Sequence, residues 1–494
     1  MNILRTSIQR GAVLGAVLPM LSGCAVGPDF VRPAQPVADR YTLEPLSAAT
    51  APADGRAQQF TPDAMLMADW WRLFKSPQLD AVVREAMTNN PTLQAAEASL
   101  RQSQDNLRAG DGVFYPRIDA NLDATRQRTA SSQQGLQTPG AIFTLVTLSG
   151  TISYALDVFG GERRMVEGLR AQAQYQGYVT RAAYLALSAN VVDTVIARAA
   201  YAAEIRATAQ LIELQNQQLR LAEAQVHAGA APYSNVLAIR SLIAADQALL
   251  APLRQRVSQS EHLLAALEGT IPSKADLPEI DLASLFLPVE LPVSLPSDLV
   301  RQRPDILSAE AQLHAASAGI GVATAAMFPS FSLSGAYGAA GPNLGRLSAA
   351  SARFWSIGPS ATIPVFQGGT LWYGRKAAID AFQQSQAGYR QAVLVAFEQV
   401  ADSLNALEHD AEALQAQVDA RRDAAEALSL LQANYRAGLV AFSEVLAADV
   451  QFHDETIAYL QAVAQRHQDT VALFAALGGG WWNGRSPADE GGAP

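Results

Sequence analysis

Cysteine is almost absent from this 494-residue chain, which contains only Cys24. A single cysteine excludes an internal disulfide, a zinc site built from cysteines and a redox-active cysteine pair. Charged residues make up only 17% of the chain, and its net charge of −10 argues against nucleic-acid binding. Long apolar runs are also missing after Cys24, which disfavours a transmembrane helix. If the chain crosses a membrane, it must therefore do so as a β-barrel.

Motifs for catalysis and for cofactor binding are also missing. The six histidines have no metal-ligand spacing, and no Ser-His-Asp motif or nucleophile elbow occurs. The glycine pairs do not lie in a phosphate-binding loop motif. The sequence therefore predicts neither an enzyme nor a protein that binds a metal or a cofactor.

The N-terminus has the pattern of a lipoprotein signal peptide, predicted for residues 1–23. Arg5 and Arg10 form a basic region, and a short apolar region from Ala12 to Met20 follows. Leu21-Ser22-Gly23-Cys24 then matches a lipobox, in which the cysteine thiol carries diacylglycerol. Cys24 is therefore the predicted lipidation site. The alternative is an ordinary signal peptide that is followed by an incidental cysteine.

The chain is internally duplicated, with matching landmarks about 210 residues apart. Phe114-Tyr115-Pro116 corresponds to Met327-Phe328-Pro329, and Ala228-Gly229 corresponds to Ala437-Gly438. Such a long period indicates two copies of one whole structural unit and not a solenoid. The predicted organisation is an N-terminal lipid-anchored segment (24–78), a first repeat (79–270), a connector (271–296), a second repeat (297–480) and a tail (481–494).

Each repeat is predicted to contain a helix, two strands and two long helices. In the first repeat, the first of these helices is predicted from Leu79 to about Ala109. Apolar and polar residues alternate in four segments of about ten residues, which is typical of strands with one apolar and one polar face. This length suffices to cross a bilayer at a tilt. The alternative is a hairpin or the edge of an ordinary β-sandwich. The predicted strands cover 117–128, 149–159, 330–340 and 354–366.

Two proline-poor stretches predict exceptionally long helices. One begins after Gly161 and continues to about Ala228, roughly 100 Å. The other covers 370–478 without proline and is interrupted at Ala437-Gly438-Leu439. A four-three apolar spacing, typical of a left-handed coiled coil, is formed by Val400, Leu404, Leu407, Ala411, Leu414 and Val418. The alternative is a plain helical hairpin that acts as a spacer.

Four strands cannot close a barrel, and lipid does not tolerate an open sheet edge. The chain is therefore expected to form oligomers. Eight strands from a dimer would leave an interior largely filled by side chains, whereas a trimer provides twelve strands and room for water. These properties predict a β-barrel that continues into a helical tube.

Several segments resemble the outer-membrane factor family of TolC-like channel tunnels, and within it the NodT-type lipoproteins of efflux systems. They are Cys24–Phe30 with Pro33, Asp69–Phe74, Asn89–Pro91, Leu295–Ile306, Ala309-Glu310, Ile320–Ala323 and Phe328-Pro329. The resemblance implies a mainly α fold with a transmembrane β-barrel, assembled as a trimer. It also implies an outer-membrane location with the helical tunnel in the periplasm, and partners in a periplasmic adaptor and an inner-membrane pump of the RND type. The expected function is passive export of drugs or other small toxic compounds.

The resemblance also implies which residues carry this function. Tyr435 and Glu444 are expected at the periplasmic aperture, whereas Ala447 stands where many relatives have an aspartate. Asp449 is expected to face elsewhere. The alternative role for Glu444 is to interact with the dipole of a helix that Ser443 caps. The predicted adaptor-docking tips are Gly229, Ala230, Gly438, Leu439 and Val440; the alternative for them is simple turn chemistry.

Four aromatic residues are candidates for a membrane-interface belt: Phe331, Tyr337, Phe354 and Trp355. Trp70-Trp71 and Trp481-Trp482 are expected to pack against the helices instead. Two other functions stay open. One is an outer-membrane channel for type I secretion of proteins. The other is a non-porous, lipid-anchored periplasmic coiled-coil scaffold, which would leave the two strand pairs unexplained.

Overall fold

A computed structural model of the chain describes residues 25–34, 38, 40–45, 47–62, 64, 66–128 and 141–483. Cys24 and the predicted signal peptide lie outside the described residues. The chain forms two compact units, each assembled from three stretches of sequence. The first unit takes its described residues from Met1–Pro33, Leu100–Gln176 and Ala309–Tyr389, and the second from Ala34–Ser99, Gly177–Ser308 and Arg390–Pro494.

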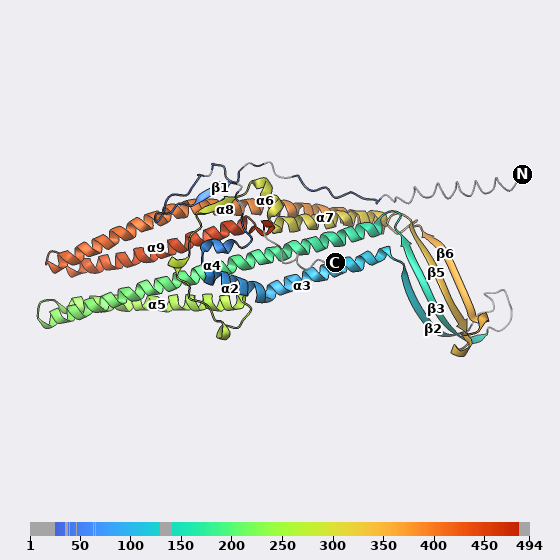
Figure 1. Cartoon of the computed structure of the whole chain (residues 1–494), viewed down its shortest axis with the longest axis horizontal. Coiled ribbons are helices and arrows are strands. Elements are labelled where there is room, and N and C mark those ends of the chain that lie inside the picture. The colour runs from blue at the N-terminus through green and yellow to red at the C-terminus, as the bar shows by residue number, and fades with distance from the viewer. Residues whose placement is uncertain are drawn as a thin grey trace. The chain divides into compact units, whose positions relative to one another are not determined.

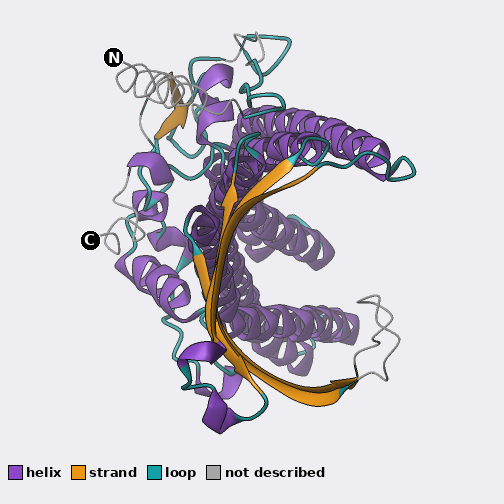
Figure 2. Ribbon diagram, turned by 90° about the vertical axis from the view of Figure 1, so that its right-hand side faces the viewer, coloured by secondary structure: helices purple, strands orange, loops and turns teal. Residues whose placement is uncertain are grey.

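The first unit contains a strongly curved, antiparallel four-stranded sheet (Figure 2). Its strands, in spatial order, are β2 (Arg117–Arg128), β3 (Ile142–Leu156), β5 (Ser330–Gly341) and β6 (Arg353–Thr362). The two repeats meet where β3 pairs with β5. The outer edges of β2 and β6 have no partner strand in the described part of the chain.

The strand boundaries agree with the predictions to within one residue except at both ends of β3 and at the end of β6. β2 covers the predicted range. β3 covers Ile142–Leu156 and not 149–159, because pairing with the last residues of β2 supports its first residues. β6 ends at Thr362 and not at 366, because Pro364 lacks the N–H that would continue the ladder.

Two helical hairpins contain most of the helical residues (Figure 1). The parts of these hairpins within residues 177–308 and 390–494 belong to the second unit. The first hairpin pairs α4 (Gly161–His227) with α5 (Tyr233–Leu267), and the second pairs α8 (Thr370–Arg436) with α9 (Phe442–Ala476). α4 and α8 both have 67 residues, and α5 and α9 both have 35. The predicted four-three stripe on α8 is buried from Val400 to Leu414.

The single helix predicted from Leu79 to about Ala109 is wrong. The chain forms two helices there, α2 (Pro77–Asn89) and α3 (Pro91–Asp111), because Pro91 forces Asn90 into an extended conformation. The Asn90 side chain accepts a hydrogen bond from the Leu93 N–H (3.0 Å) and donates one to the Leu267 carbonyl (2.8 Å). The second repeat has the corresponding break between α6 (Pro296–Gln302) and α7 (Pro304–Ala325).

The predicted connector contributes to the core of the second unit. Its strand β4 (Glu290–Val293) pairs in parallel with β1 (Gln59–Pro62), which lies before the first repeat. Nearby, Trp70 is 1% exposed and its ring lies 5.6 Å from that of Phe474. The expectation that Trp70-Trp71 packs against the helices is therefore confirmed.

One helix in the described chain, α5, is long and apolar enough to cross a membrane by length and composition alone. The same helix carries the buried Asp246, whose carboxylate accepts a hydrogen bond from Gln215 on α4. Because α5 is paired with α4 in the hairpin, its apolar residues also have a packing role. A single helix of this kind is weak evidence for a membrane span.

Candidate functional site

The sheet of the first unit has one apolar and one polar face. Residues on one face include Ile118, Leu122, Leu148, Ile152, Leu333, Tyr337, Trp355 and Ile357, and all eight are exposed. Neighbouring strands place these side chains beside one another, as in the pair Tyr337 and Trp355. Apolar residues on an ordinary protein surface are scattered singly or form small patches, whereas this exposed apolar face continues across four strands.

The opposite face carries mainly serine, threonine and acidic side chains. They include Asp119, Asn121, Asp123, Ser149, Thr151, Ser332, Ser334, Ser356 and Ser360. Ser332 and Ser360 are hydrogen bonded across β5 and β6 at 2.8 Å, and Asn121 donates to Thr151 at 3.4 Å. These short polar side chains suit a surface that contacts water.

Three of the four candidates for an aromatic belt lie on the apolar face, but Phe354 does not. Strand alternation and the register place Phe354 opposite Gly338, on the polar face. A Cβ atom built on Gly338 would lie 2.9 Å from the Phe354 ring, so the ring covers this glycine. The sequence prediction was wrong because Phe354 and Trp355 are adjacent, and adjacent residues in a strand point to opposite faces.

The two hairpin turns have the same hydrogen-bonding pattern. In the first, Ala230 N–H donates to the Gln225 carbonyl at 2.8 Å; in the second, Leu439 N–H donates to Asn434 at 2.9 Å. Together with the bonds from the preceding glycines, these are Schellman motifs. Gly229 and Gly438 have φ values of 71° and 75°, a conformation that favours glycine.

The predicted tip residues are at the surface. Gly229, Ala230, Gly438 and Leu439 are exposed, and Val440 is half-buried. Leu439 is 74% exposed. The five residues therefore form two exposed turns of backbone and small or apolar side chains.

The predicted aperture residues occupy different environments. The Tyr435 hydroxyl donates to Gln225 Oε1 on the other hairpin at 3.3 Å, and its ring lies 5.1 Å from that of Phe442. Glu444 is exposed in the first turn of α9. α9 begins at Phe442 after Ala441, so Ser443 lies within the helix and does not cap it. α5 likewise begins at Tyr233 after Pro232.

Asp449 faces elsewhere, as expected. It is 2% exposed, and its carboxylate lies 3.4 Å from the Gln215 amide nitrogen, which also donates to Asp246 at 2.7 Å. Burial raises the pKa of Asp449, while the Gln215 hydrogen bond opposes this rise. Asp449 therefore belongs to the contact between the two hairpins and not to an exposed ring.

A second group of acidic side chains, which are half-buried, lies among α4, α8 and α9. Burial, followed by the like charge of Asp469, raises the pKa of Asp193 to about 7. Burial and a hydrogen bond with Asp469 raise the pKa of Asp410 to about 8. Within the described chain, no group of three or more His, Cys, Asp or Glu side chains is arranged to hold a metal ion.

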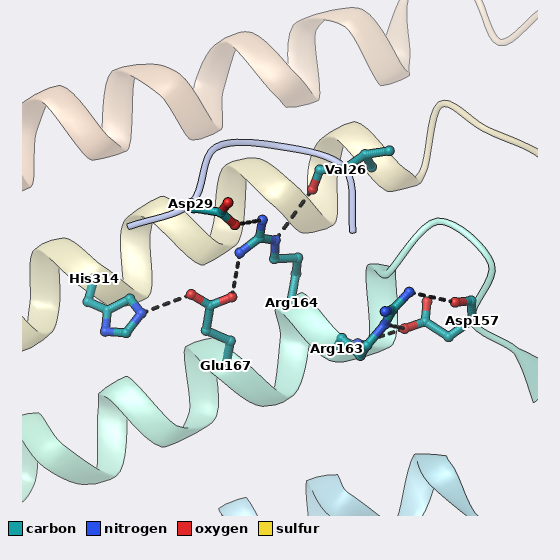
Figure 3. A network of polar contacts seen from close by, with 7 residues as sticks. All are labelled: Val26, Asp29, Asp157, Arg163, Arg164, Glu167 and His314. Atoms are coloured by element: carbon teal, nitrogen blue, oxygen red, sulfur yellow. Dashed lines mark hydrogen bonds and ion pairs between the residues drawn. The ribbon is translucent and has the colours of Figure 1, made fainter. Parts of the chain in front are cut away.

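Sequence reasoning missed an ionic network that fixes the N-terminal segment to the first unit (Figure 3). Arg164 on α4 donates to Asp29 at 2.6 Å and to Glu167 at 2.7 Å, and it contacts the Val26 carbonyl at 3.4 Å. His314 on α7 lies 2.9 Å from Glu167. Burial alone would raise the pKa of Glu167, but the hydrogen bonds from Arg164 and His314 lower it.

Packing reinforces this attachment. The Phe30 ring stacks on His314 with centroids 4.3 Å apart. Gly27 has φ of 95°, and a Cβ atom there would lie 2.6 Å from Gly321 Cα. Gly27 and Gly321 therefore allow two backbones to approach closely. Both glycines belong to segments that carried the family resemblance, and this was the only signal for the contact in the sequence.

Comparison with known proteins agrees with this geometry. A sequence model described as outer membrane efflux protein matches residues 82–270 and 295–479, which are most of both repeats. The chain belongs to the outer membrane efflux protein family. A relative with a described function is the toluene efflux pump outer membrane protein TtgC of Pseudomonas putida, 28% identical over 95% of this chain and 96% of its own length.

Other members of the outer membrane efflux protein family support the same fold and location. The cation efflux system protein CusC of Escherichia coli is 28% identical over 93% of this chain and 96% of its own length. The outer-membrane channel OprN superposes with a TM-score of 0.83 at 26% identity, covering 93% of this chain and all of OprN. The chain thus has the fold of a TolC-like channel and serves as the outer-membrane component of an efflux system. The membership in the NodT-type subgroup stays a prediction.

Proposed function

We propose that three copies of the chain close one twelve-stranded barrel. The observation that carries this proposal is the four-stranded sheet with an exposed apolar face, a polar face and two outer edges that lack a partner strand within the described chain. Joining β6 of one copy to β2 of the next satisfies both edges. Three copies place the apolar face towards lipid and enclose the polar face around water.

The hairpins carry the gate and the docking surface in this proposal. Tyr435 and Phe442 hold the second tip beside Gln225 of the first hairpin, and Glu444 narrows the passage at the same level. A periplasmic adaptor docks on the two exposed turns, and an inner-membrane pump of the RND type loads the channel. Because Gly229 and Gly438 have no Cβ atom, they permit close approach of a partner helix.

The covalent lipid on Cys24 adds a second membrane attachment. The network around Arg164 holds residues 26–30 against the first unit, so an acyl group on the preceding residues stays near the sheet. The lipid is the only non-protein group that the proposal requires, because a passive conduit needs no cofactor.

The proposed cargo is drugs or other small toxic compounds. Relatives are named for toluene and for cation efflux, and the serine- and threonine-rich polar face is compatible with many solutes. Type I secretion of proteins is the second candidate, favoured only by the shared channel architecture.

Conductance and cross-linking test the pore. Purified protein in a planar bilayer should form channels, and chemical cross-linking should give a ladder that ends at three copies. Glu444→Ala should increase the conductance of the closed state, with Glu412→Ala on α8, where the side chain is also exposed, as the matched control. Material that stays monomeric in mild detergent, or that never conducts, would refute the pore.

Cross-linking in cells tests the docking surface separately. Cysteine at Ala230 or Val440 should capture the adaptor, whereas cysteine at Ala266, exposed and about 50 Å along α5 from the turn, should not. Equal capture at all three positions would contradict docking at the tips. A deletion strain distinguishes the two cargo classes. Loss of drug resistance with unchanged protein secretion would assign the channel to drugs, and loss of protein secretion with unchanged drug resistance would assign it to proteins.

A further inference from the structure

The end of the sheet where β2 turns to β3 and β5 turns to β6 carries only positive charge. Between residues 124 and 156 the charged residues are Arg126 and Arg128, and between 330 and 374 they are Arg346 and Arg353. The whole chain, in contrast, has a net charge of −10. Of the acidic residues of the strands, Asp119 lies near the helical end of β2 and Asp123 lies at its middle, and both belong to the polar face.

All four arginines belong to the apolar face. Arg126 and Arg128 continue the row of Ile118 and Leu122 at every second residue of β2. Arg353 lies opposite Ala339 and is two residues from Trp355, in the corresponding row of β6.

Arg346 comes from the turn between β5 and β6. A Cβ atom built on Gly341 would point to the apolar face and would lie 3.2 Å from Arg346 Cβ. Arg346 therefore covers this face as well. The arginines thus form a basic margin along the end of the apolar face, here called the arginine margin: Arg126, Arg128, Arg346 and Arg353.

These guanidinium groups have no ionic or hydrogen-bonded partner in the part of the chain that the structure describes, and all four residues are exposed. Two other arginines of the same unit are paired: Arg117 lies 2.9 Å from Asp119, and Arg163 lies 3.2 Å from Asp157. The arginine margin therefore has unused hydrogen-bond donors on a surface without carboxylates.

The spacing along β2 places the margin at a membrane surface. Arg126 lies eleven residues beyond Tyr115, an exposed aromatic residue before the strand. At about 3.3 Å per residue and a tilt of about 40°, this corresponds to roughly 28 Å along the membrane normal. The hydrocarbon core is about 30 Å thick, and the outward apolar band of such barrels is about 25 Å. Tyr115 and Arg126 thus reach opposite interfaces.

We propose that the arginine margin binds the phosphate groups of anionic lipids in the outer leaflet of the outer membrane. Guanidinium groups form paired, charge-assisted hydrogen bonds with phosphate oxygens. The adjoining Leu122 and Trp355 contact the acyl chains of the same lipids. The inference rests on the outer-membrane location of the sheet, and it does not depend on the number of copies or on the cargo.

Titration of purified full-length protein in neutral detergent with diphosphoryl lipid A tests this proposal. The triple variant Arg126→Gln, Arg128→Gln, Arg353→Gln should bind about 100-fold more weakly, since each arginine near an anionic lipid surface contributes about fivefold. Arg117→Gln, on the polar face of β2, is the matched control and should bind like the wild type. Channel conductance should persist in the triple variant.

Further measurements keep the test informative if the triple variant does not fold. The corresponding triple lysine variant keeps the charge and should bind within about tenfold of the wild type. Raising NaCl from 50 to 500 mM should weaken binding to the wild type. The proposal fails if salt has no effect, if the lysine and glutamine variants lose binding equally, or if Arg117→Gln loses as much as the triple variant. Displacement of lipid A by 10 mM inorganic phosphate would assign the margin to free phosphate and would also overturn it.

Discussion

Replacing Asp193 by asparagine should stabilise the protein at neutral pH and have little effect in acid. Asp193 Oδ1 is buried and has no hydrogen-bond partner in the described chain, and Asp469 adds a like charge nearby. Burial and this charge raise the pKa of Asp193 from 3.8 to about 7. The native state therefore keeps a proton that the unfolded state releases between pH 4 and 7.

The sign and size of the effect follow from this difference in proton binding. Over this range the native state binds more protons than the unfolded state, so the free energy of unfolding falls as pH rises. A shift from 3.8 to about 7 corresponds to at most about 4 kcal/mol at pH 7.5. Because the side chain keeps partial access to water, we expect about 2 kcal/mol. Asparagine carries no charge and avoids this cost.

Urea unfolding in mild detergent, followed by circular dichroism at pH 4.0 and 7.5, measures the effect. Asp193→Asn should raise the unfolding midpoint at pH 7.5 and nearly match the wild type at pH 4.0. Asp123→Asn, an exposed change on the polar face of the sheet, is the control and should not show this pH dependence. The same increase at both pH values, or a lower midpoint at pH 7.5, would refute the assigned cause.

Three further changes test other parts of the structure. Gly438→Ala should lower the free energy of unfolding by about 1 kcal/mol, because φ is 75° there. Gly374→Ala inside α8 should raise it by up to about 1 kcal/mol, and equal effects of the two changes in thermal unfolding would contradict this account. Phe354→Ala should raise single-channel conductance, and Trp355→Ala on the opposite face should leave it unchanged; the reverse result would place Phe354 outside the lumen. Arg164→Ala should weaken the attachment of the N-terminal segment by about 1–2 kcal/mol. Amide hydrogen exchange at residues 26–30 should then be faster, whereas unchanged exchange would show that packing alone holds the segment.

Local sequence pattern was sufficient to predict most elements of the fold. Proline-free stretches defined α4 and α8, and a period of two defined β2 and β5, because both features follow from backbone geometry. The break at Asn90 was missed because the apolar periodicity continues through it, although Pro91 marks the boundary. The early start of β3 was missed because its first residues are supported by pairing with β2.

Less of the candidate site than of the fold could be predicted from the sequence. The turns at Gly229 and Gly438 could be found because glycine at a helix end has a local meaning. The ionic network was not predictable, because Asp29, Arg164 and His314 lie far apart in the chain and each alone is an ordinary polar residue. The side of Asp449 could be inferred from its helical phase, but its contact with Gln215 required the paired hairpins.

The equal lengths of the two hairpins restrict how this protein can evolve. Each residue added to one long helix moves its turn by about 1.5 Å and rotates it by about 100°. A change confined to α4 and α5 would leave that turn out of step with the one that joins α8 to α9. Insertions and deletions should therefore survive in matched sets, introduced in both halves of the gene and in multiples of seven codons.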